Sequence, residues 1–122
     1  MVGYVTLGTN DIERAAAFYD ALLGSIGAKR VMDMGTFILW GTDPAKAMLA
    51  VTKPFDGNAA TVGNGVMVAL AVDSQEKVQA VYAKARELGG ADEGAPGPRG
   101  DSFYAGYFRD LDGNKLNAFF VG

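Results

Sequence analysis

The side chains available for chemistry in this sequence are carboxylates, phenols, arginines, lysines and one tryptophan, because the chain contains no histidine and no cysteine. Without histidine it lacks the commonest metal ligand and the usual general base. Without cysteine it lacks thiolate nucleophiles, disulfides and sulfur-ligated metal sites. Ser-His-Asp, Cys-His, zinc-histidine and two-His-one-carboxylate chemistries are therefore excluded, and catalysis would have to use Asp, Glu, Lys, Tyr, Arg or a borrowed cofactor.

Three tyrosines in β-prone runs, Tyr4, Tyr104 and Tyr107, are candidates for proton transfer or for hydrogen bonding to a ligand. Aromatic residues in strands mostly bury area, so we interpret these phenols first as core or cavity lining. Trp40 either stacks on a ligand or fills the sheet, and the sequence leaves open which face of its strand it occupies.

Four charged residues of the C-terminal part are further candidates. Arg99 and Arg109 could hold a substrate carboxylate in a bidentate clamp, but exposed arginines more often serve solubility, and we favour that interpretation. Asp110 and Asp112 resemble a carboxylate pair. Their place in the sequence Asp-Leu-Asp-Gly favours an Asx turn instead, in which a side chain accepts hydrogen bonds from nearby backbone N–H groups.

A β-hairpin is the clearest element that must position these residues. Two runs rich in aromatic and β-favouring residues, within 102–109 and 115–121, flank a turn in which Asp112-Gly113 supplies the positive φ that a tight turn requires. Strand alternation divides the last run into two rows. The apolar row suits a helix and contains Leu116, Ala118 and Phe120, whereas the more polar row contains Lys115, Asn117 and Phe119.

The first half of the chain predicts a strand, a helix and three short strands. Residues 5–9 are β-prone, Asn10 is positioned to cap the following helix with Glu13 at the reciprocal position, and apolar residues then recur at helical spacing up to Gly27. Three further β-prone segments occupy 29–34, 36–41 and 47–52.

The second half repeats this pattern at an offset of 63 residues, so that Val5 falls on Val68 and Tyr19 on Tyr82. Asp73 is the expected helix cap there. The segment 53–65 connects the halves, and 94–100 is expected to be a loop because it collects glycine and proline. We therefore predict one domain, residues 1–122, built from two βαβββ modules at about 1–55 and 66–122, each with one sheet face left uncovered by its helix.

Composition limits the partners. A formal charge of −3 and a pI near 4.8 provide no basic stripe for phosphates, so nucleic acid is not expected as a partner. No apolar run approaches the ~20 residues of a membrane helix, and Met1-Val-Gly-Tyr4 leads into structure without a basic signal region, so no membrane association and a cytoplasmic location are expected.

The segment Tyr107-Phe-Arg-Asp-Leu-Asp-Gly-Asn-Lys-Leu116, together with Val5 to Leu23, resembles the glyoxalase / bleomycin-resistance / extradiol dioxygenase superfamily, also called the vicinal oxygen chelate fold. The resemblance covers essentially the whole chain. It implies an α+β fold in which two βαβββ modules form an open, cup-shaped eight-stranded mixed sheet with helices on the outer face and the site inside. Many members are homodimers, so a homodimer is expected.

The resemblance places the metal-ligand positions of the family, usually His, Gln or Glu, at Tyr4, Ala50, Met67 and Asn117. A hard divalent cation needs several oxygen or imidazole donors. A methyl group supplies none, a thioether is soft, a phenol resists ionisation, and one amide is insufficient. No metal and no other cofactor are therefore expected.

The leading hypothesis is a metal-independent protein that binds, and thereby sequesters or carries, a small molecule that is partly aromatic or amphipathic. The expected lining residues are Tyr4, Thr6, Trp40, Met67, Tyr104, Asn117 and Phe119. The resemblance to bleomycin-resistance proteins, which bind without chemistry, supports it. The alternative is a lyase, isomerase or dioxygenase of the glyoxalase type with an atypical divalent-metal site or none, and a third possibility is a dimerising interaction module.

Overall fold

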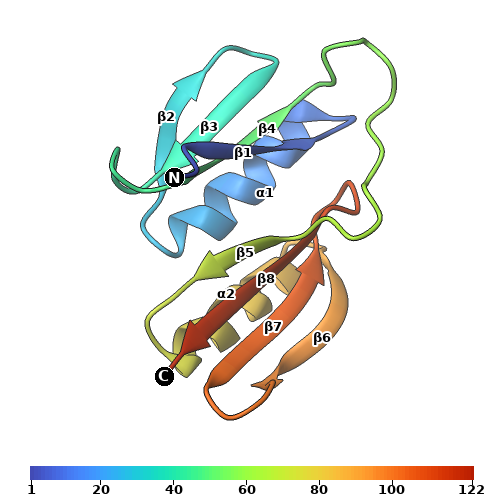
Figure 1. Cartoon of the computed structure of the whole chain (residues 1–122). Helices are drawn as coiled ribbons and strands as arrows, with labels where there is room; N and C mark the ends of the chain where they lie inside the picture. The colour runs from blue at the N-terminus through green and yellow to red at the C-terminus, as the bar shows by residue number, and fades with distance from the viewer. The chain divides into compact units, whose positions relative to one another are not determined.

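Each half of the chain has the same order of elements: one strand, one helix and three strands (Figure 1). The computed structural model describes residues 1–122, which divide into units of residues 1–62 and 63–122. The first unit contains β1 (Tyr4–Gly8), α1 (Ile12–Gly24), β2 (Lys29–Asp33), β3 (Phe37–Gly41) and β4 (Met48–Thr52). The second contains β5 (Val68–Ala71), α2 (Gln75–Glu87), β6 (Ala91–Pro98), β7 (Phe103–Arg109) and β8 (Lys115–Val121). The α+β fold with two βαβββ modules is confirmed.

The strands form two four-stranded mixed sheets, in the orders β1-β4-β3-β2 and β5-β8-β7-β6, and no closed barrel. Each sheet has one parallel pair at an edge, and its other pairs are antiparallel. Thr6 pairs with Ala50 in the first sheet, and Ala69 pairs with Asn117 in the second. Ala50 and Asn117 therefore hold equivalent positions in the two modules, as the sequence repeat predicted.

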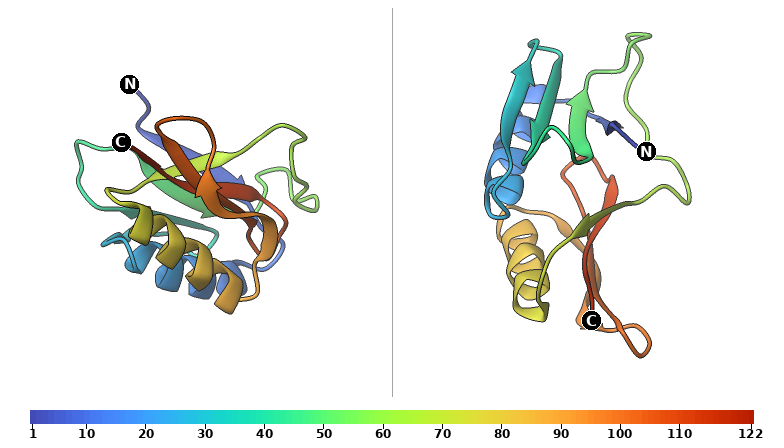
Figure 2. Two further views of the ribbon diagram at one scale, coloured as in Figure 1. Left: turned by 90° about the horizontal axis from the view of Figure 1, so that it is seen from below. Right: turned by 60° about the vertical axis from the view of Figure 1, so that its left-hand side comes forward.

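Each helix lies against one face of the sheet of its own unit (Figure 2). Apolar positions at helical spacing explain this packing, since they form one continuous stripe. In α1 the buried residues are Ala15, Ala16, Phe18, Tyr19, Leu22 and Leu23, and in α2 they are Val78, Val81 and Ala85. Neither helix combines the length and the hydropathy that a membrane-crossing helix requires.

Both helices begin one residue later than the capping pattern predicted. Asp11, not Asn10, caps α1 by accepting a hydrogen bond from the Arg14 N–H at 3.1 Å. The Asn10 amide instead donates to the Ala60 carbonyl at 3.2 Å and accepts from the Ala60 N–H at 2.7 Å, so it holds the connecting segment against the end of β1. In the second unit Ser74 takes the cap position that was expected for Asp73. In both units two neighbouring residues can cap a helix about equally well, so the sequence alone does not determine which of the two is the N-cap.

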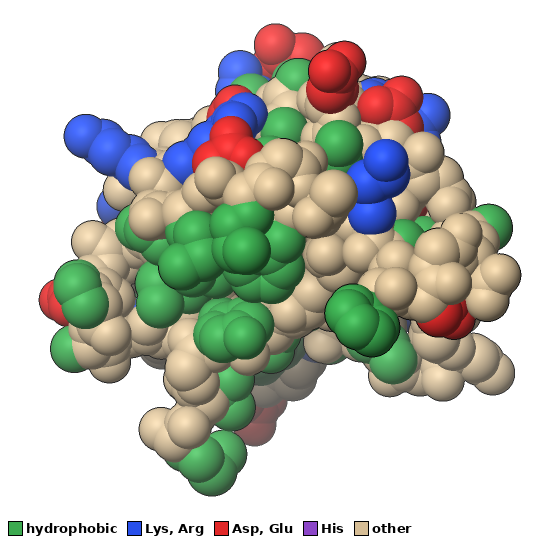
Figure 3. All heavy atoms as spheres, turned by 90° about the horizontal axis from the view of Figure 1, so that it is seen from above, with side chains coloured by type: hydrophobic (Ala, Val, Ile, Leu, Met, Phe, Trp, Pro, Cys, Tyr) green, Lys and Arg blue, Asp and Glu red, His purple; other side chains and the backbone are tan.

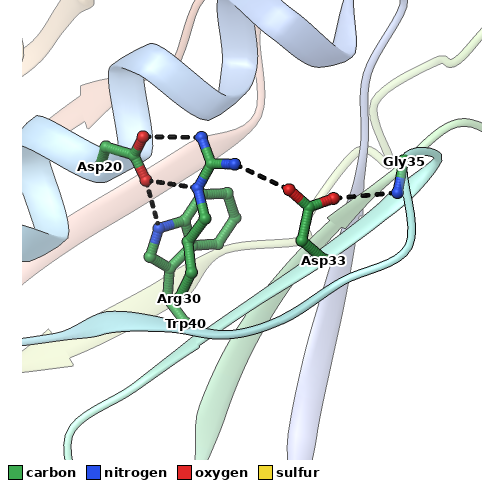
Figure 4. Close-up of polar contacts among 5 residues, drawn as sticks. All are labelled: Asp20, Arg30, Asp33, Gly35 and Trp40. Carbon is green, nitrogen blue, oxygen red and sulfur yellow. Dashed lines mark hydrogen bonds and ion pairs between the residues drawn. The ribbon is translucent and has the colours of Figure 1, made fainter.

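Trp40 fixes α1 to the first sheet. Its indole N–H donates to the Asp20 carboxylate at 2.9 Å, and Arg30 from β2 donates to the same carboxylate at 2.9 and 2.7 Å (Figure 4). Arg30 also bonds Asp33 at 2.9 Å. Trp40 is only 1% exposed, and its ring centroid lies 5.7 Å from that of Tyr19. One carboxylate on the helix thus joins two strands.

Residues 94–98 belong to strand β6, which corrects the expectation of a loop over 94–100. The register of β6 against β7 shifts between Asp92 and Gly94 and again between Gly94 and Gly97, so the strand is bulged. Its prolines are tolerated because β6 is an edge strand and needs no hydrogen bonds on its outer side. A Cβ on Gly106 would lie 3.0 Å from the Pro96 ring, so glycine on β7 makes room for this strand.

The turn between β7 and β8 is an Asx turn, as predicted. One carboxylate oxygen of Asp110 accepts from the N–H groups of Asp112 and Asn114, both at 2.9 Å. Gly113 has a φ of 89°, which a residue with a side chain rarely adopts. This turn sets the β7–β8 register, in which Arg109 pairs with Lys115 and Tyr107 with Asn117.

Candidate functional site

In the second unit, one face of the sheet is covered by α2 and the opposite face is not. Leu116 and Ala118 of β8 are fully buried on the helix side, so Asn117 and Phe119 leave the sheet on the other side. The β7–β8 register places every side chain on one of these two faces. We call the uncovered face the second open face, and it comprises Ala69, Ala71, Phe103, Ala105, Tyr107, Arg109, Lys115, Asn117, Phe119 and Val121.

Aromatic rings occupy two places on the second open face. Phe103 and Phe119 are stacked, with ring centroids 5.4 Å apart and an interplanar angle of 15°. Farther along the same strands, the Arg99 guanidinium lies 5.4 Å from the centroid of the Tyr107 ring, and the Lys115 ammonium lies 5.6 Å from it. The face therefore offers planar apolar surface at one end and positive charge over an aromatic ring at the other.

Asn117 is the buried polar residue of this face. Its side chain is 1% exposed, and its amide oxygen Oδ1 has no hydrogen-bond partner in the protein. A buried polar atom without a partner costs about 1–3 kcal/mol, so such atoms are few in native proteins and each one calls for an explanation. In the sheet Asn117 lies between Tyr107 and Ala69, and Ala69 is exposed and carries only a methyl group.

The Arg109 guanidinium is already engaged. It pairs with the Glu93 carboxylate of β6 and donates to the Gly113 carbonyl at 2.8 Å. Arg109 holds the pKa of Glu93 below its usual range, and the nearby charge of Lys115 lowers that pKa further. Arg99 donates to the Ala95 carbonyl at 2.8 Å but has no carboxylate within ion-pairing distance. Of the two arginines considered for a clamp, only Arg99 lacks a carboxylate partner.

The first unit also has an uncovered sheet face, defined by the register of β1, β4 and β3. Its side chains include Tyr4 and Thr6 of β1, Ala50 of β4, and Phe37 and Leu39 of β3. Tyr4 and Phe37 meet edge to face, with ring centroids 6.1 Å apart at an interplanar angle of 82°. Tyr4 and Thr6 are exposed, whereas Ala50 is fully buried.

Two residues expected to line the site lie on the helix side of their sheets. Trp40 pairs with Leu49 on the face that packs on α1, and it bonds Asp20 of that helix. Tyr104 pairs with Phe120, and its hydroxyl accepts a hydrogen bond at 2.8 Å from Gln79 of α2. These contacts correct the inclusion of both residues. Strand parity decides the matter, since a shift of one residue moves a side chain to the other face.

The remaining candidates stay on the uncovered faces, in two groups. Tyr4 and Thr6 belong to the first unit, and Asn117 and Phe119 belong to the second. Met67 immediately precedes β5 and is 41% exposed. Sequence reasoning left Phe103, Tyr107 and Lys115 out of the lining. Counting outward from the Asx turn would have found them, because that turn pairs Arg109 with Lys115 and so places Tyr107 opposite Asn117.

The resemblance placed metal ligands at four positions of the chain. They hold a phenol, a methyl group, a thioether and an amide, in Tyr4, Ala50, Met67 and Asn117. No group of three or more His, Cys, Asp or Glu side chains lies together elsewhere in the structure. This donor set does not suit a hard divalent cation, which prefers several carboxylate, carbonyl or imidazole ligands.

The family model described as "Glyoxalase/Bleomycin resistance protein/Dioxygenase superfamily" matches residues 1–118. The chain belongs to this superfamily. Among solved structures, it is similar to a glyoxalase/bleomycin resistance protein from Albidiferax ferrireducens T118, with 36% identity and a TM-score of 0.92, covering 100% of this chain and 99% of that chain. No curated protein matches the sequence.

Two solved structures of lower sequence identity share the fold. A lactoylglutathione lyase from Agrobacterium tumefaciens is 18% identical with a TM-score of 0.73, covering 98% of this chain and 92% of that chain. A fosfomycin resistance protein from Mesorhizobium loti is 16% identical with a TM-score of 0.71, covering 100% of this chain and 92% of that chain. At such identities the likeness concerns the fold, and activity has to be argued from the site.

Proposed function

We propose that this superfamily member is a small-molecule-binding protein that sequesters or carries a partly aromatic ligand without a metal. The observation that carries the proposal is Asn117, a buried amide with an unpartnered oxygen on an aromatic face. The resemblance places a metal ligand at this position, and an uncharged amide there favours hydrogen bonding to a ligand over coordination of a cation.

Binding would draw on two kinds of interaction. The stacked Phe103 and Phe119 rings offer apolar area, and each Å² removed from water contributes roughly 25 cal/mol. The Asn117 oxygen would accept a hydrogen bond from the ligand and so fix its orientation. Met67 beside this face is proposed as a further contact. Tyr4 and Thr6 are proposed to contact a ligand on the uncovered face of the first unit, whereas Trp40 and Tyr104 are not proposed as contacts.

The enzymatic alternative is a glyoxalase-type lyase or isomerase, or a dioxygenase, with an atypical metal site or none. It is favoured only by the exposed phenol of Tyr4 and the half-buried phenol of Tyr107, which could take part in proton transfer. Mass spectrometric metal analysis of untagged protein separates the two, because a histidine tag would add the imidazoles that the chain lacks. A stoichiometric transition metal would favour the enzyme.

The binding proposal is tested by a thermal-shift screen of planar aromatic compounds and antibiotics, with calorimetry on every compound that raises the melting temperature. A ligand that binds the native state raises that temperature by mass action. Saturable one-to-one binding by metal-free protein supports the proposal. If no compound in the panel stabilises the protein above buffer, a binding role loses its basis.

We also propose a homodimer in the cytoplasm. Hydrophobic side chains are exposed among charged ones on the protein surface (Figure 3), and in the first unit they include Val31, Met32 and Met34 at the edge strand β2. Exposed apolar side chains at a sheet edge favour association. Light scattering after size exclusion gives the molar mass, and a value near 12.8 kDa at micromolar concentration would argue against the dimer.

A further inference from the structure

Positive charge is concentrated on the second open face although the whole protein carries a net charge of −3. Arg99, Arg109 and Lys115 contribute three cationic groups there, whereas Glu93 contributes one carboxylate, which pairs with Arg109. Lys115 has no carboxylate within ion-pairing distance, and its ammonium group lies over the Tyr107 ring. Arg99 and Lys115 therefore remain available to a negatively charged group.

Lys115 and the buried amide of Asn117 are two residues apart on β8 and point to the same side of the sheet. In a strand that spacing corresponds to about 6.6–6.8 Å. Their chemical demands differ, because the ammonium group only donates hydrogen bonds, whereas the unpartnered Asn117 oxygen requires a donor. A molecule that satisfies both carries an anionic group at one end and an N–H or O–H at the other.

The aromatic side chains around Lys115 and Asn117 indicate which chemical group of the ligand connects its anionic end to its donor end. Tyr107 is paired with Asn117 across the sheet, and Phe119 follows Asn117 on the same face with its ring stacked on Phe103. Planar rings favour offset stacking or edge contacts with other rings. The neighbouring Ala69 and Ala71 are exposed and small, and Ala69 pairs with Asn117 on the β5 side of the sheet.

We propose that the second open face selects an aromatic carboxylate bearing a hydroxyl or amino donor, with its carboxylate at Lys115 and Arg99 and its donor at the Asn117 oxygen. This inference rests on the proposed binding function and specifies its ligand class. Charge-assisted hydrogen bonds are stronger than neutral ones, so the carboxylate contributes more to selectivity than the ring does. The hydroxyl or amino group of the ligand contributes because it donates a hydrogen bond to the Asn117 oxygen, a buried acceptor that otherwise has no partner.

Calorimetric titration with three matched probes tests the assignment on the full chain. Para-hydroxybenzoate has both groups, para-hydroxybenzamide lacks the charge, and para-methoxybenzoate lacks the donor. Each is titrated into wild type, Lys115→Met and Asn117→Leu, with Lys29→Met as the matched control because Lys29 is exposed on β2 of the first unit. Circular dichroism and melting temperature establish that each variant is folded.

Wild type is expected to bind para-hydroxybenzoate about tenfold more tightly than para-hydroxybenzamide, because a hydrogen bond to a charged group is worth about that factor. A preference of about tenfold over para-methoxybenzoate is expected because that probe leaves the buried Asn117 acceptor unsatisfied. Lys115→Met should weaken the preference over the amide, because Arg99 remains as the second cation, and Asn117→Leu should abolish the preference over the methoxy compound. Lys29→Met should change neither. Each site variant should therefore reduce one preference and leave the other.

Three results would overturn the inference, and they differ in whether they also refute the binding function. Equal affinity of wild type for para-hydroxybenzoate and para-hydroxybenzamide would refute the anionic ligand class while leaving the binding function in place. The same holds if neutral aromatics from the wider screen bind and the carboxylates do not. Failure of every probe and every compound in the wider screen would refute the binding function as well.

Discussion

Asn117 lies directly opposite Tyr107 in the β7–β8 ladder, and both side chains leave the sheet on the face that α2 does not cover. One residue supplies a buried acceptor without a partner, and the other supplies a ring beneath two cationic groups. This pairing makes the second open face the strongest candidate for ligand binding in the chain. It also yields predictions that separate the residues of this face from those under the helices.

Replacing Asn117 by leucine should stabilise the protein or leave its stability unchanged. The substitution removes an unsatisfied buried acceptor at similar volume, so the free energy of unfolding is expected to rise by up to about 1 kcal/mol. Urea unfolding measures the change. Asn64→Leu in the exposed connecting segment is the control and should stay within about 0.5 kcal/mol. A loss of 2 kcal/mol in Asn117→Leu would mean that the amide is satisfied in solution.

The two tyrosines of β7 should respond differently to truncation. Tyr107→Ala removes an aromatic ring from the second open face. It should lower the affinity for aromatic ligands about tenfold, which is typical of truncating a well-packed aromatic contact. Tyr104→Ala removes a ring on the helix side that is bonded to Gln79, and it should change affinity less than about twofold. Calorimetry on both variants decides the point, and an equal loss would contradict the face assignment.

Trp40 should report on folding and not on binding. It is the only tryptophan and is held beneath α1 by Asp20, so its fluorescence should stay constant on ligand addition and shift on unfolding. Trp40→Phe should destabilise the protein by about 1–3 kcal/mol, since it loses a hydrogen bond to a carboxylate and leaves a cavity, while ligand affinity is retained. Ligand-dependent quenching in the wild type would restore Trp40 to the binding site.

The contribution of Asp20 should depend on pH. Hydrogen bonds from Arg30, and from Trp40, hold the pKa of Asp20 below its ordinary value of 3.8. A depressed pKa in the folded state contributes stability above that ordinary value, and this contribution is lost as the pH falls through the folded pKa. The ion pair is nearly half exposed, so the effect is under about 1 kcal/mol.

A comparison of wild type with Asp20→Asn by urea unfolding at pH 7 and pH 3 measures this contribution. The difference in unfolding free energy between the two proteins should be larger at pH 7 than at pH 3. Asp43→Asn, in an exposed turn of the same unit, controls for a general loss of one carboxylate. An Asp20→Asn difference that is the same at both pH values would show that Arg30 does not stabilise the ionised carboxylate.

Strand alternation was sufficient to assign side chains to the two sheet faces where the residues of one face differ in polarity from those of the other. The row of Leu116, Ala118 and Phe120 contrasts in polarity with the row of Lys115 and Asn117, so the sides of β8 were assigned correctly before the structure. The internal repeat located the equivalent of Asn117 at Ala50 for the same reason. The difference in polarity between alternating residues and the internal repeat can both be recognised from the sequence alone.

The residues that sequence reasoning misplaced depend on pairing between strands. β3 is apolar on both faces, with Ile38, Leu39 and Trp40 all buried, so no contrast marked the side of Trp40. The side of Tyr104 follows from the turn at Asp110, which fixes how β7 pairs with β8. The extension of β6 over 94–98 was missed because Gly94, Pro96 and Pro98 disfavour a strand, and only its position at the sheet edge allows it.

The most direct test of metal-independent binding is a calorimetric titration of untagged protein with its best aromatic ligand in EDTA, repeated after adding nickel, manganese, iron or zinc. Because Tyr4, Ala50, Met67 and Asn117 lack the donors for a divalent cation, the account predicts one-to-one binding in EDTA with an affinity that metals do not change. Binding or turnover that appears only after a metal is added would contradict it.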